Sequence, residues 1–457
     1  MSSAAPRPTP AGRHELVATR EAGALFATRR GEPITLQRFM HDVRRTAEAL
    51  PDARHVLNFC ADRYRFAVVF CAAVTRGQMT LLPPTTTPNV IAAMRSFAPD
   101  VFYVSDDDAQ EIDLPRSALP ADDGSAPRPL EIPKIPNDQL VACLFTSGST
   151  GEPQPHFKTW GGLVKDMAAE ARCFGVGPGH TILGTVPPQH MFGFESTVLL
   201  PLQSGATLTA ERLYYPADID TAIQRCESPR MLFITPFHLR AWMESGGSAR
   251  IETIVSATAP LSVGLAREAE ARTGAHLYEI YGCTEAGQVA SRRTSQTPEW
   301  QVLEGLRITS QGDQATVTGG HVERPTPLMD IIEPIGDGTR FLLHGRIADM
   351  VNIAGKRNSI GYLDHQLHAI PGVLDGAFFM PDETDPDGVT RLMAFVVAPT
   401  LTPAQVTAAL RERIDAAFLP RPIVMLERLP RQLTGKLTRD SLLALAREHG
   451  IAAADRG

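Results

Sequence analysis

The sequence predicts an α/β protein with a large N-terminal domain of parallel and mixed sheets and a small α+β domain at the C-terminus. Three observations support this prediction. The chain has 457 residues, enough for two or three domains with large cores. Strand-like and helix-like segments alternate through most of it, as in βαβ units, and the pattern changes past residue 346. We therefore expect a large domain over residues 1–345 and a small one over 346–457.

The first units of the predicted large domain lie between residues 55 and 104. A short apolar run reads as a strand, and the helical pattern after it stops at Gly77. The expected order is strand His55–Cys60, helix Tyr64–Arg76, strand Met79–Leu82, helix Val90–Phe97 and strand Val101–Val104. The next segment, Ser105–Gln139, holds six prolines and many acidic residues, so we expect an irregular surface connection.

The alternation then resumes and continues to about residue 280. We expect strands at Val141–Phe145, Met231–Ile234, Glu252–Ser256 and Leu277–Ile280, with helices after Pro236 and over Leu261–Thr273. In the small domain we expect a helix near Leu363–Ala369, a strand at Leu392–Val397, and helices from Pro403 and from Arg439. Parallel sheets bind ligands at the loops that leave the C-terminal ends of their strands, so functional motifs are expected in those loops.

Composition and charge argue against several classes of protein. Apolar residues make up 43% and charged residues 21%, as in globular proteins, and the net charge of −7 argues against a nucleic-acid binder. The six cysteines lie far apart, which fits reduced thiols better than disulfides or a zinc site. The longest apolar run, Phe66–Val74, is too short to span a bilayer, and the N-terminus has no apolar segment typical of a signal peptide. We expect a cytoplasmic protein.

The basic residues are divided very unequally, with 39 arginines and only five lysines. Codon usage in a GC-rich genome explains the bias itself. Arginine cannot replace lysine where a compact ammonium on a flexible stem is needed, so each lysine is worth locating. The five are Lys134, Lys158, Lys165, Lys356 and Lys436.

The sharpest local motif runs from Leu144 to Pro153, where a predicted buried strand opens into a loop of small hydroxyl residues and glycines. Such a loop can present backbone N–H groups and hydroxyls to phosphate oxygens. It is not a Walker A loop, because no Gly-Lys-Ser/Thr follows at the required spacing. Taken alone, the segment is either a phosphate loop or an ordinary turn.

Three later segments favour the phosphate loop. Tyr281-Gly-Cys-Thr-Glu285 follows a predicted strand and offers an aromatic ring, a hydroxyl and a carboxylate on one tight turn. Gly345–Arg357 falls at the predicted domain junction, and Leu429–Lys436 falls on a loop before the last helix. In order and separation, the four segments resemble the motifs of the adenylate-forming superfamily of acyl- and aryl-CoA synthetases, nonribosomal adenylation domains and luciferases. The resemblance covers residues from about 50 to 445 and implies a mobile small domain.

The resemblance implies a set of residues that bind ATP and Mg²⁺. The loop Thr146, Ser147, Gly148, Ser149, Thr150 and Gly151 would hold the β- and γ-phosphates. Tyr281 would stack on adenine, Thr284 would face the α-phosphate, and Glu285 would bind Mg²⁺. Asp330 and Arg346, sixteen residues apart, match the ribose-binding Asp and the hinge Arg. Ser256–Leu261, with Ala257 and Thr258, resembles the Gly-Gly-Ala-Pro-Leu segment that borders adenine and the acyl group.

The resemblance also implies catalytic and substrate residues. Lys436 would bridge the substrate carboxylate and the ribose side during adenylation, and Gly355 would line the thiol tunnel. Pro188–Gly193 resembles the segment that gates the acyl pocket, which places His190 at the gate. The predicted pocket residues are His190, Phe192, Gly193, Phe233, Thr235, Ser256, Ala257, Cys283 and Gly287. The acceptor would be a phosphopantetheine thiol, on CoA or an acyl carrier protein.

The sequence departs from the family pattern at several positions. The phosphate loop usually ends Pro-Lys-Gly, but here Gln154 stands in place of the lysine, with Lys158 four residues on. Ala348 stands where the hinge usually has Asp or Lys. Asn352 replaces a common Lys, and Ser359 a common Glu. Because the principal catalytic positions are kept, we expect retained catalysis.

Other motifs are interpreted more simply. His365 and His368 share one helix face without a third ligand nearby, which favours a surface helix over a metal site. Gly175–Gly179 reads as a turn, and Cys283 reads as a pocket wall residue and not a nucleophile. Phe192, Phe233 and Phe237 either line an acyl pocket or fill the core.

The substrate is predicted to be a small aryl acid, because small residues and aromatics cluster in the pocket motifs. No Asp stands where amino-acid-activating members hold the α-amino group, and Glu195 is the nearest acid. The short N-terminal part and the Gln-Pro phosphate loop resemble the stand-alone ligases of bacterial aryl polyene and xanthomonadin pigment pathways, which implies a 3- or 4-hydroxybenzoate-type substrate. Two alternatives stay open: a medium-chain acyl or amino-acid activator, and a nucleotide-binding protein without catalysis.

Overall fold

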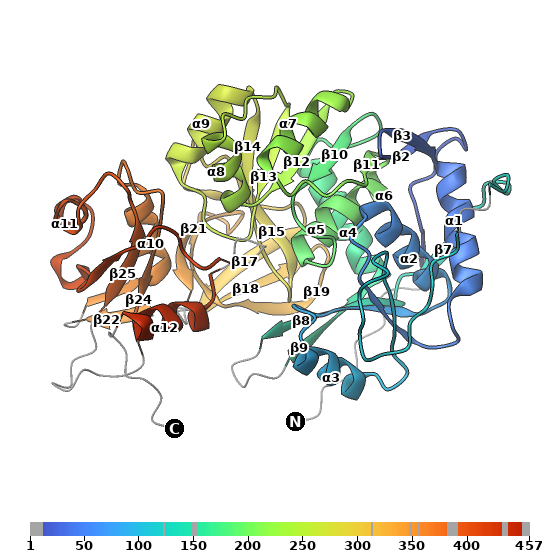
Figure 1. Cartoon of the computed structure of the whole chain (residues 1–457), viewed down its shortest axis with the longest axis horizontal. Helices are drawn as coiled ribbons and strands as arrows, with labels where there is room; N and C mark the ends of the chain where they lie inside the picture. Colours follow the sequence, from blue (N-terminus) through green and yellow to red (C-terminus); the bar gives the residue numbers. More distant parts are fainter. Residues whose placement is uncertain are drawn as a thin grey trace.

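A computed structural model describes residues 12–121, 124–147, 153–311, 314–346, 350–353, 356–381, 392–431 and 437–449. Two sheets with helices around them form most of the molecule, and the last elements of the chain lie together at one end (Figure 1). The α/β fold predicted from the sequence is confirmed.

The first sheet has five strands in the order β6-β4-β5-β8-β9. Its strands are β4 (His55–Asn58), β5 (Met79–Leu82), β6 (Phe102–Val104), β8 (Leu140–Ser147) and β9 (Pro153–Thr159). Helices α2 (Arg63–Thr75) and α3 (Pro88–Phe97) connect the parallel strands, as predicted. The antiparallel strand β9 was not predicted, because its sequence contains two prolines and lacks a strict apolar alternation.

The second sheet has eleven strands in the order β20-β21-β16-β15-β14-β13-β12-β10-β11-β2-β3. Strands β10 to β14 and β2 run parallel, and β14, β15, β16, β21 and β20 run antiparallel. Their bounds are β2 (Leu25–Arg29), β3 (Glu32–Thr35), β10 (Thr181–Gly184), β11 (Thr207–Thr209), β12 (Arg230–Ile234), β13 (Thr253–Ser256), β14 (His276–Cys283), β15 (Gly287–Arg292), β16 (Trp300–Val302), β20 (Asp330–Ile335) and β21 (Arg340–Arg346). The sheet is thus half parallel, because tight connections after β14 replace the helical crossovers.

Helices and small sheets complete the large part of the chain. The helices are α1 (Leu36–Ala49), α4 (Trp160–Phe174), α5 (Met191–Phe194), a π-helical turn (Glu195–Leu199), α6 (Leu200–Ser204), α7 (Pro216–Arg225), α8 (Pro236–Glu244) and α9 (Val263–Thr273). The small sheets pair β1 (Arg13–Glu15) with β7 (Lys134–Pro136), and β17 (Leu306–Gln311) with β18 (Gln314–Gly319) and β19 (Val322–Leu328).

Helix α2 is buried on almost every side, and it contacts strands of both main sheets. Its first residue, Arg63, is 2% exposed and ties the helix to the second sheet. The guanidinium donates to the carbonyl oxygens of Gly184 at 2.7 Å and Val186 at 3.0 Å. These carbonyls end β10, so a buried cation fixes the chain just before the predicted gate segment at 188–193.

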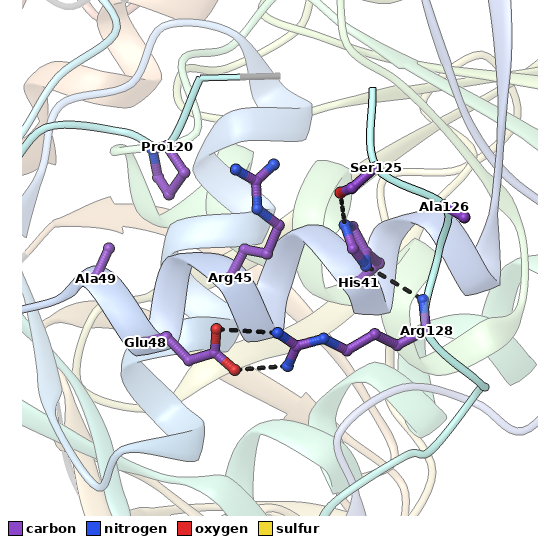
Figure 2. A pocket seen from close by; sticks show the side chains of 8 residues that line it. All are labelled: His41, Arg45, Glu48, Ala49, Pro120, Ser125, Ala126 and Arg128. Carbon is purple, nitrogen blue, oxygen red and sulfur yellow. Dashed lines mark hydrogen bonds and ion pairs between the residues drawn. The ribbon is translucent and has the colours of Figure 1, made fainter. Parts of the chain in front are cut away.

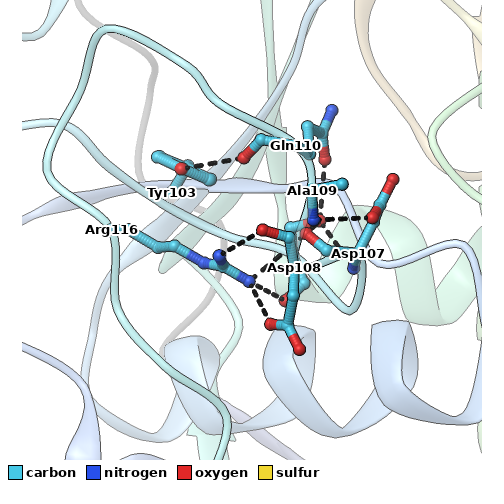
Figure 3. Close-up of polar contacts among 7 residues, drawn as sticks. Tyr103, Asp107, Asp108, Ala109, Gln110 and Arg116 are labelled. Atoms are coloured by element: carbon cyan, nitrogen blue, oxygen red, sulfur yellow. Dashed lines mark hydrogen bonds and ion pairs between the residues drawn. The ribbon is translucent and has the colours of Figure 1, made fainter.

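Where it is described, the predicted irregular connection, Ser105–Gln139, contains the short strand β7 and no other named strand or helix, and it is held by local polar contacts (Figure 3). The Tyr103 hydroxyl donates to the Gln110 carbonyl at 3.2 Å, and the Arg116 guanidinium donates to Asp108 Oδ1 at 2.9 Å. The backbone N–H of Ala109 donates to Asp107 Oδ1 at 2.9 Å. The acidic residues of this segment therefore serve as turn acceptors.

The C-terminal elements form a two-stranded sheet (β22-β23) and a three-stranded sheet (β24-β25-β26), with hydrophobic clusters of their own. They are β22 (Met350–Ile353), β23 (Lys356–Ser359), α10 (Ile360–His368), β24 (Asp375–Phe379), β25 (Met393–Val397), α11 (Pro403–Arg411), a 3-10 turn (Ala416–Phe418), β26 (Ile423–Met425) and α12 (Arg439–Glu448). The predicted helices and strand of this part are confirmed within three residues.

The chain enters this C-terminal part through a tight contact at Gly345. Its φ is +116°, and a Cβ there would lie 2.2 Å from Ser359 Oγ, so only glycine fits. Ser359, which replaces a common Glu of the family, is 2% exposed and donates to the carbonyl oxygen of His344. The small side chain at 359 is therefore required by packing against the backbone of β21.

Candidate active site

The predicted phosphate loop connects the two strands of a β-hairpin. Thr146 pairs with Gln154, and Ser147 pairs with Pro153, at the ends of β8 and β9. Gly148, Ser149, Thr150 and Gly151 lie outside the described residues. Because the loop joins the strands of a hairpin, Gln154 and Lys158 lie on an extended strand. After a Walker A loop they would lie on a helix instead.

One histidine links this hairpin to the second motif. His156 Nε2 lies 2.9 Å from Thr146 Oγ1 and 3.7 Å from Glu285 Oε1. Burial lowers the pKa of His156, while the negative charge of Glu285 opposes this. The structure thus brings two of the predicted site residues, Thr146 and Glu285, to the same histidine, and it adds His156, which the sequence analysis missed. Its position two residues after Gln154, on the same face of β9, was the available signal.

The second motif is arranged differently from its prediction. Tyr281, Gly282 and Cys283 belong to strand β14 and do not lie on a turn. The strand continues because β15 pairs with it, with Cys283 opposite Gly287. Only residues 284–286 form the turn. Thr284 is therefore half-buried on the turn and Glu285 is exposed, while Tyr281 is fixed in the sheet.

Tyr281 and Asp330 form a direct hydrogen bond. The Tyr281 hydroxyl donates to Asp330 Oδ2 at 2.7 Å, and the ring packs edge-on against Trp300 at 5.8 Å and Phe341 at 5.7 Å between centroids. Asp330 lies directly opposite Arg346 in the β20–β21 pair. The predicted adenine and ribose residues thus meet at one end of the sheet. Tyr281 also orients the Asp330 carboxylate, a role that the sequence did not predict.

The segment after β13 matches the Gly-Gly-Ala-Pro-Leu resemblance in its backbone. Thr258 has a φ of +82°, in the left-handed region that favours glycine. Ala257 is 8% exposed and Ser256 is fully buried, and Ser256 Oγ has no hydrogen-bond partner among the described residues. Threonine thus adopts a backbone conformation that favours glycine, at a position where the Gly-Gly-Ala-Pro-Leu segment has glycine.

The predicted gate segment forms helix α5. His190 is the N-cap, and its Nδ1 accepts from the backbone N–H of Phe192 at 3.3 Å. A Cβ on Gly193 would lie 2.1 Å from the carbonyl oxygen of Pro187, so glycine is required there. The Phe192 and Phe233 rings pack against each other with 5.9 Å between their centroids, and both are buried in the same hydrophobic core cluster. These two rings fill core, whereas Phe237 is 44% exposed on α8.

Two other predicted pocket residues have structural partners. Burial and the charge of Glu285 raise the pKa of Cys283 to about 12, so its thiol is protonated at neutral pH, as expected of a wall residue. Thr235 is the N-cap of α8, and its Oγ1 lies 2.8 Å from His238 Nδ1. The Thr235 hydroxyl is therefore already occupied.

Stability should fall at mildly acidic pH because of His238. Burial lowers its pKa to about 4, whereas an unfolded histidine titrates near 6.5. The unfolded chain binds this proton first, so the contribution is fully present above pH 6.5 and is lost as the pH falls toward 4. We expect about 2 kcal/mol to be lost between pH 7.5 and pH 5, and His238→Gln to remove that loss. Urea unfolding of both proteins at the two pH values measures it, and an unchanged pH slope in the variant would contradict it.

Comparison with known proteins decides the family. A model of the AMP-binding enzyme family matches residues 17–331, about two thirds of the chain. The chain belongs to the AMP-binding enzyme family. By class it is an AMP-forming acid–thiol ligase, an enzyme that uses ATP and generally Mg²⁺. The adenylate-forming resemblance seen in its motifs is thereby confirmed.

Two characterised relatives are carboxylic acid ligases. This AMP-binding enzyme is 31% identical to the 4-coumarate–CoA ligase of Rhodobacter capsulatus over 285 residues, 62% of this chain and 70% of that protein. It is 25% identical to the 3-hydroxybenzoate–CoA/4-hydroxybenzoate–CoA ligase of Thauera aromatica over 360 residues, 68% of this chain and 67% of that protein. Among solved structures, ATP-bound MatB from Rhodopseudomonas palustris superposes with a TM-score of 0.80 at 19% identity, covering 94% of this chain and 97% of that one. This likeness confirms the adenylate-forming fold.

The donor chemistry at Glu285 suits Mg²⁺. Among the described residues, no three His, Cys, Asp or Glu side chains are grouped to hold a metal ion. Mg²⁺ commonly takes one or two carboxylates and completes its shell with water and phosphate oxygens. Glu285 is an exposed carboxylate beside the phosphate hairpin, so this AMP-binding enzyme can supply the single protein ligand that such a site needs.

The predicted residues of the C-terminal part are described only in part. Lys436, Gly355 and Ala348 lie outside the described residues, and Arg346 is described only as the last residue of β21. The segment that carries Lys436 is anchored before it: the Arg431 guanidinium donates to both oxygens of Asp375, at 2.7 and 2.8 Å. Burial favours a raised pKa for Asp375, but this arginine lowers it well below its usual range.

Other candidate sites do not join the active site. His365 and His368, expected on an exposed helix face, are only partly exposed, and His368 contacts Asp375 and the carbonyl oxygen of Asp364. A pocket of about 520 Å³ lies elsewhere, between α1 and the segment after Pro120 (Figure 2). In it Arg128 is paired with Glu48 at 2.6 Å, and His41 contacts Ser125 at 3.1 Å. These contacts hold the long connection against α1. No helix among the described residues is long and apolar enough to cross a membrane.

Proposed function

We propose that this enzyme activates a small aryl carboxylic acid of the hydroxybenzoate type with ATP and transfers the aryl group to a phosphopantetheine thiol of CoA or an acyl carrier protein. The observation that carries the proposal is the convergence of two motifs at His156, which contacts Thr146 at 2.9 Å and Glu285 at 3.7 Å. The hydroxybenzoate–CoA ligase among its relatives supports the substrate class.

The proposed first step joins two anions. The substrate carboxylate attacks the α-phosphate of ATP, and pyrophosphate leaves, so the developing charge must be neutralised. The loop at 146–151 holds the β- and γ-phosphates, and Thr284 faces the α-phosphate. Asp330, oriented by Tyr281, accepts from the ribose hydroxyls. Lys436 neutralises charge at the reacting oxygen, and Mg²⁺ bound at Glu285 would supply a second positive charge.

The proposed second step is thiol transfer. The thiol sulfur attacks the acyl carbon of the aryl-adenylate, a thioester forms, and AMP leaves. We propose that residues 346–457 form a domain that reorients between the two steps about Arg346, with Gly355 lining the thiol tunnel. His190 would gate the acyl pocket. A place in aryl polyene or xanthomonadin-type pigment synthesis, in the cytoplasm where ATP and CoA are found, completes the proposal.

A panel of acids tests this proposal through ATP–pyrophosphate exchange. We expect exchange with 3- or 4-hydroxybenzoate at rates well above those with octanoate or amino acids. Exchange only with alkyl acids or amino acids would show that the substrate is not an aryl acid. No exchange with any acid would favour a nucleotide-binding protein without catalysis. Product analysis with CoA and with a phosphopantetheinylated carrier protein then identifies the acceptor.

A further inference from the structure

A group of buried polar side chains lies between helix α4 and the β14–β15 hairpin, outside the nucleotide residues described above. We call it the acid cluster. Each member is at most 7% exposed. The cluster consists of Asp166 and Glu170 on α4, Glu195 and Ser196 on the π-helical turn, Gln288 on β15, and His321.

The members of the acid cluster are linked by hydrogen bonds and close contacts. Ser196 Oγ donates to Glu170 Oε1 at 2.8 Å, and Gln288 Nε2 donates to Ser196 Oγ at 3.3 Å. His321 Nε2 lies 3.5 Å from Asp166 Oδ1. Three elements that are distant in sequence therefore direct their polar groups to one buried place.

The acid cluster has more acceptors than donors. Within the described part of the chain, Asp166 Oδ1, Glu170 Oε2 and Glu195 Oε1 have no hydrogen-bond partner, and the nearest contact of Asp166 Oδ1 is His321 Nε2 at 3.5 Å. The same holds for two side chains that are not acids, namely Gln288 Oε1 and both ring nitrogens of His321. Folded proteins satisfy nearly all buried polar atoms, so this many open atoms in one place indicates a missing polar partner.

The charge of the cluster favours a neutral partner. Burial raises the pKa of Glu170 to about 8 and raises that of Glu195 well above its usual range. Burial therefore favours the protonated form of both carboxyl groups, and the positive charge of Lys158 partly opposes this at Glu195. A hydroxyl both donates and accepts, so it can pair with a carboxylate and with a protonated carboxyl at once.

The cluster borders the predicted acyl pocket. A Cβ on Gly287 would lie 2.5 Å from Asp166 Oδ2 and 3.4 Å from His321 Nε2, so the backbone of this predicted pocket residue packs directly against the buried cluster. Cys283, another predicted pocket residue, pairs with Gly287 across the hairpin. Glu195 follows Gly193 of the gate segment by two residues.

We infer that the acid cluster binds a hydroxyl group on the aromatic ring of the acid substrate and thereby selects hydroxylated acids. The inference rests on the proposed function, because it concerns the acyl pocket of the same reaction. Glu195 and Glu170 become specificity-determining residues, and Ser196, itself bound by Gln288, holds Glu170 in place. An aryl acid without a ring hydroxyl leaves the buried acceptors unpaired and is rejected for that reason.

The wild-type enzyme gives the first test. Adenylation is measured as kcat/KM with benzoate, 3-hydroxybenzoate, 4-hydroxybenzoate, 4-methoxybenzoate and 4-aminobenzoate. We expect one hydroxybenzoate to exceed both benzoate and 4-methoxybenzoate by about 100-fold or more. Equal rates with benzoate, or a preference for the amine, would overturn the inference while leaving the proposed function intact. No exchange with any aromatic acid would instead refute the proposed function.

Two variants then assign the preference to the cluster. In Glu195→Gln an amide nitrogen, which donates and cannot accept, replaces one carboxyl oxygen, so one acceptor for the ring hydroxyl is lost. We expect the hydroxybenzoate preference to fall below about 10-fold in this variant and in Glu170→Gln. Glu270→Gln is the control, since Glu270 lies on α9, outside the acid cluster, and is paired with Arg293. This variant should have a lower melting temperature and keep the preference for hydroxybenzoate. If both cluster variants keep the wild-type preference while folded, the inference is wrong.

Discussion

Replacing Lys436 with alanine should lower ATP–pyrophosphate exchange by roughly 1,000-fold and leave thioester formation from a preformed aryl-adenylate largely intact. The reason is electrostatic. In adenylation a carboxylate meets a phosphate, and a positioned ammonium offsets their repulsion. In thiol transfer AMP is already a leaving group, so the same ammonium is not needed. The two half-reactions are measured separately, the second with synthetic adenylate and CoA.

Lys165→Ala is the matched control for this experiment. Lys165 is an exposed lysine on α4 with no assigned role, so its loss should change neither half-reaction by more than about 2-fold. If adenylation survives in Lys436→Ala, the role assigned to Lys436 is wrong. If both half-reactions fail equally, the lysine serves folding or general binding. Circular dichroism of the variant separates these two explanations.

The described residues on either side of Lys436 have defined partners. Arg431 makes a two-point ion pair with Asp375 on β24, five residues before the lysine. Thr438 caps helix α12 two residues after it. The scarcity of lysine in this chain adds no functional argument, but it leaves few alternative cations of this kind.

The fold was predictable where local pattern and tertiary structure agree. Strand Met79–Leu82 was predicted to the residue, and helix α2 within one residue, because Asp62 caps its start and Gly77 ends its pattern. The extension of β14 to Cys283 was not predictable, because it depends on pairing with β15 and not on its own sequence. The sheet of β17, β18 and β19 was missed for the same reason: polar residues alternate there without a strong apolar pattern.

The site was predictable as a set of motifs but not as a set of contacts. The resemblance indicated Tyr281 and Asp330, yet the 2.7 Å hydrogen bond between them joins residues 49 positions apart. His156 and the acid cluster carry no recognisable motif. The acid cluster is recognisable only when α4, the π-helical turn and β15 pack together, because burial makes an unpaired carboxylate informative. His156 is recognisable only when β9 lies beside the turn that carries Glu285.

Replacing Glu285 with glutamine should lower adenylation by about 100-fold at fixed Mg²⁺ and raise the Mg²⁺ concentration needed for half-maximal rate. Glutamine keeps the shape of the side chain but loses the charge that attracts a divalent cation. Glu285 is exposed on the turn at 284–286, and substitutions at exposed positions change stability much less than substitutions in the core. Thermal unfolding of the variant measures any loss of stability.

A Mg²⁺ titration of the Glu285→Gln rate decides between metal binding and a second possibility, that Glu285 acts only through His156. Glu285 Oε1 lies 3.7 Å from His156 Nε2, and its negative charge partly offsets the lowering of the His156 pKa by burial. If Glu285 acts through His156, the variant should change the pH profile of the rate and leave its Mg²⁺ dependence as in the wild type. If Glu285 binds the metal, excess Mg²⁺ should recover part of the rate. Glu304→Gln, an exposed glutamate paired with Arg172, is the control and should change neither dependence. If excess Mg²⁺ recovers the rate of Glu285→Gln alone, the metal binds at the turn between β14 and β15, beside the β8–β9 hairpin.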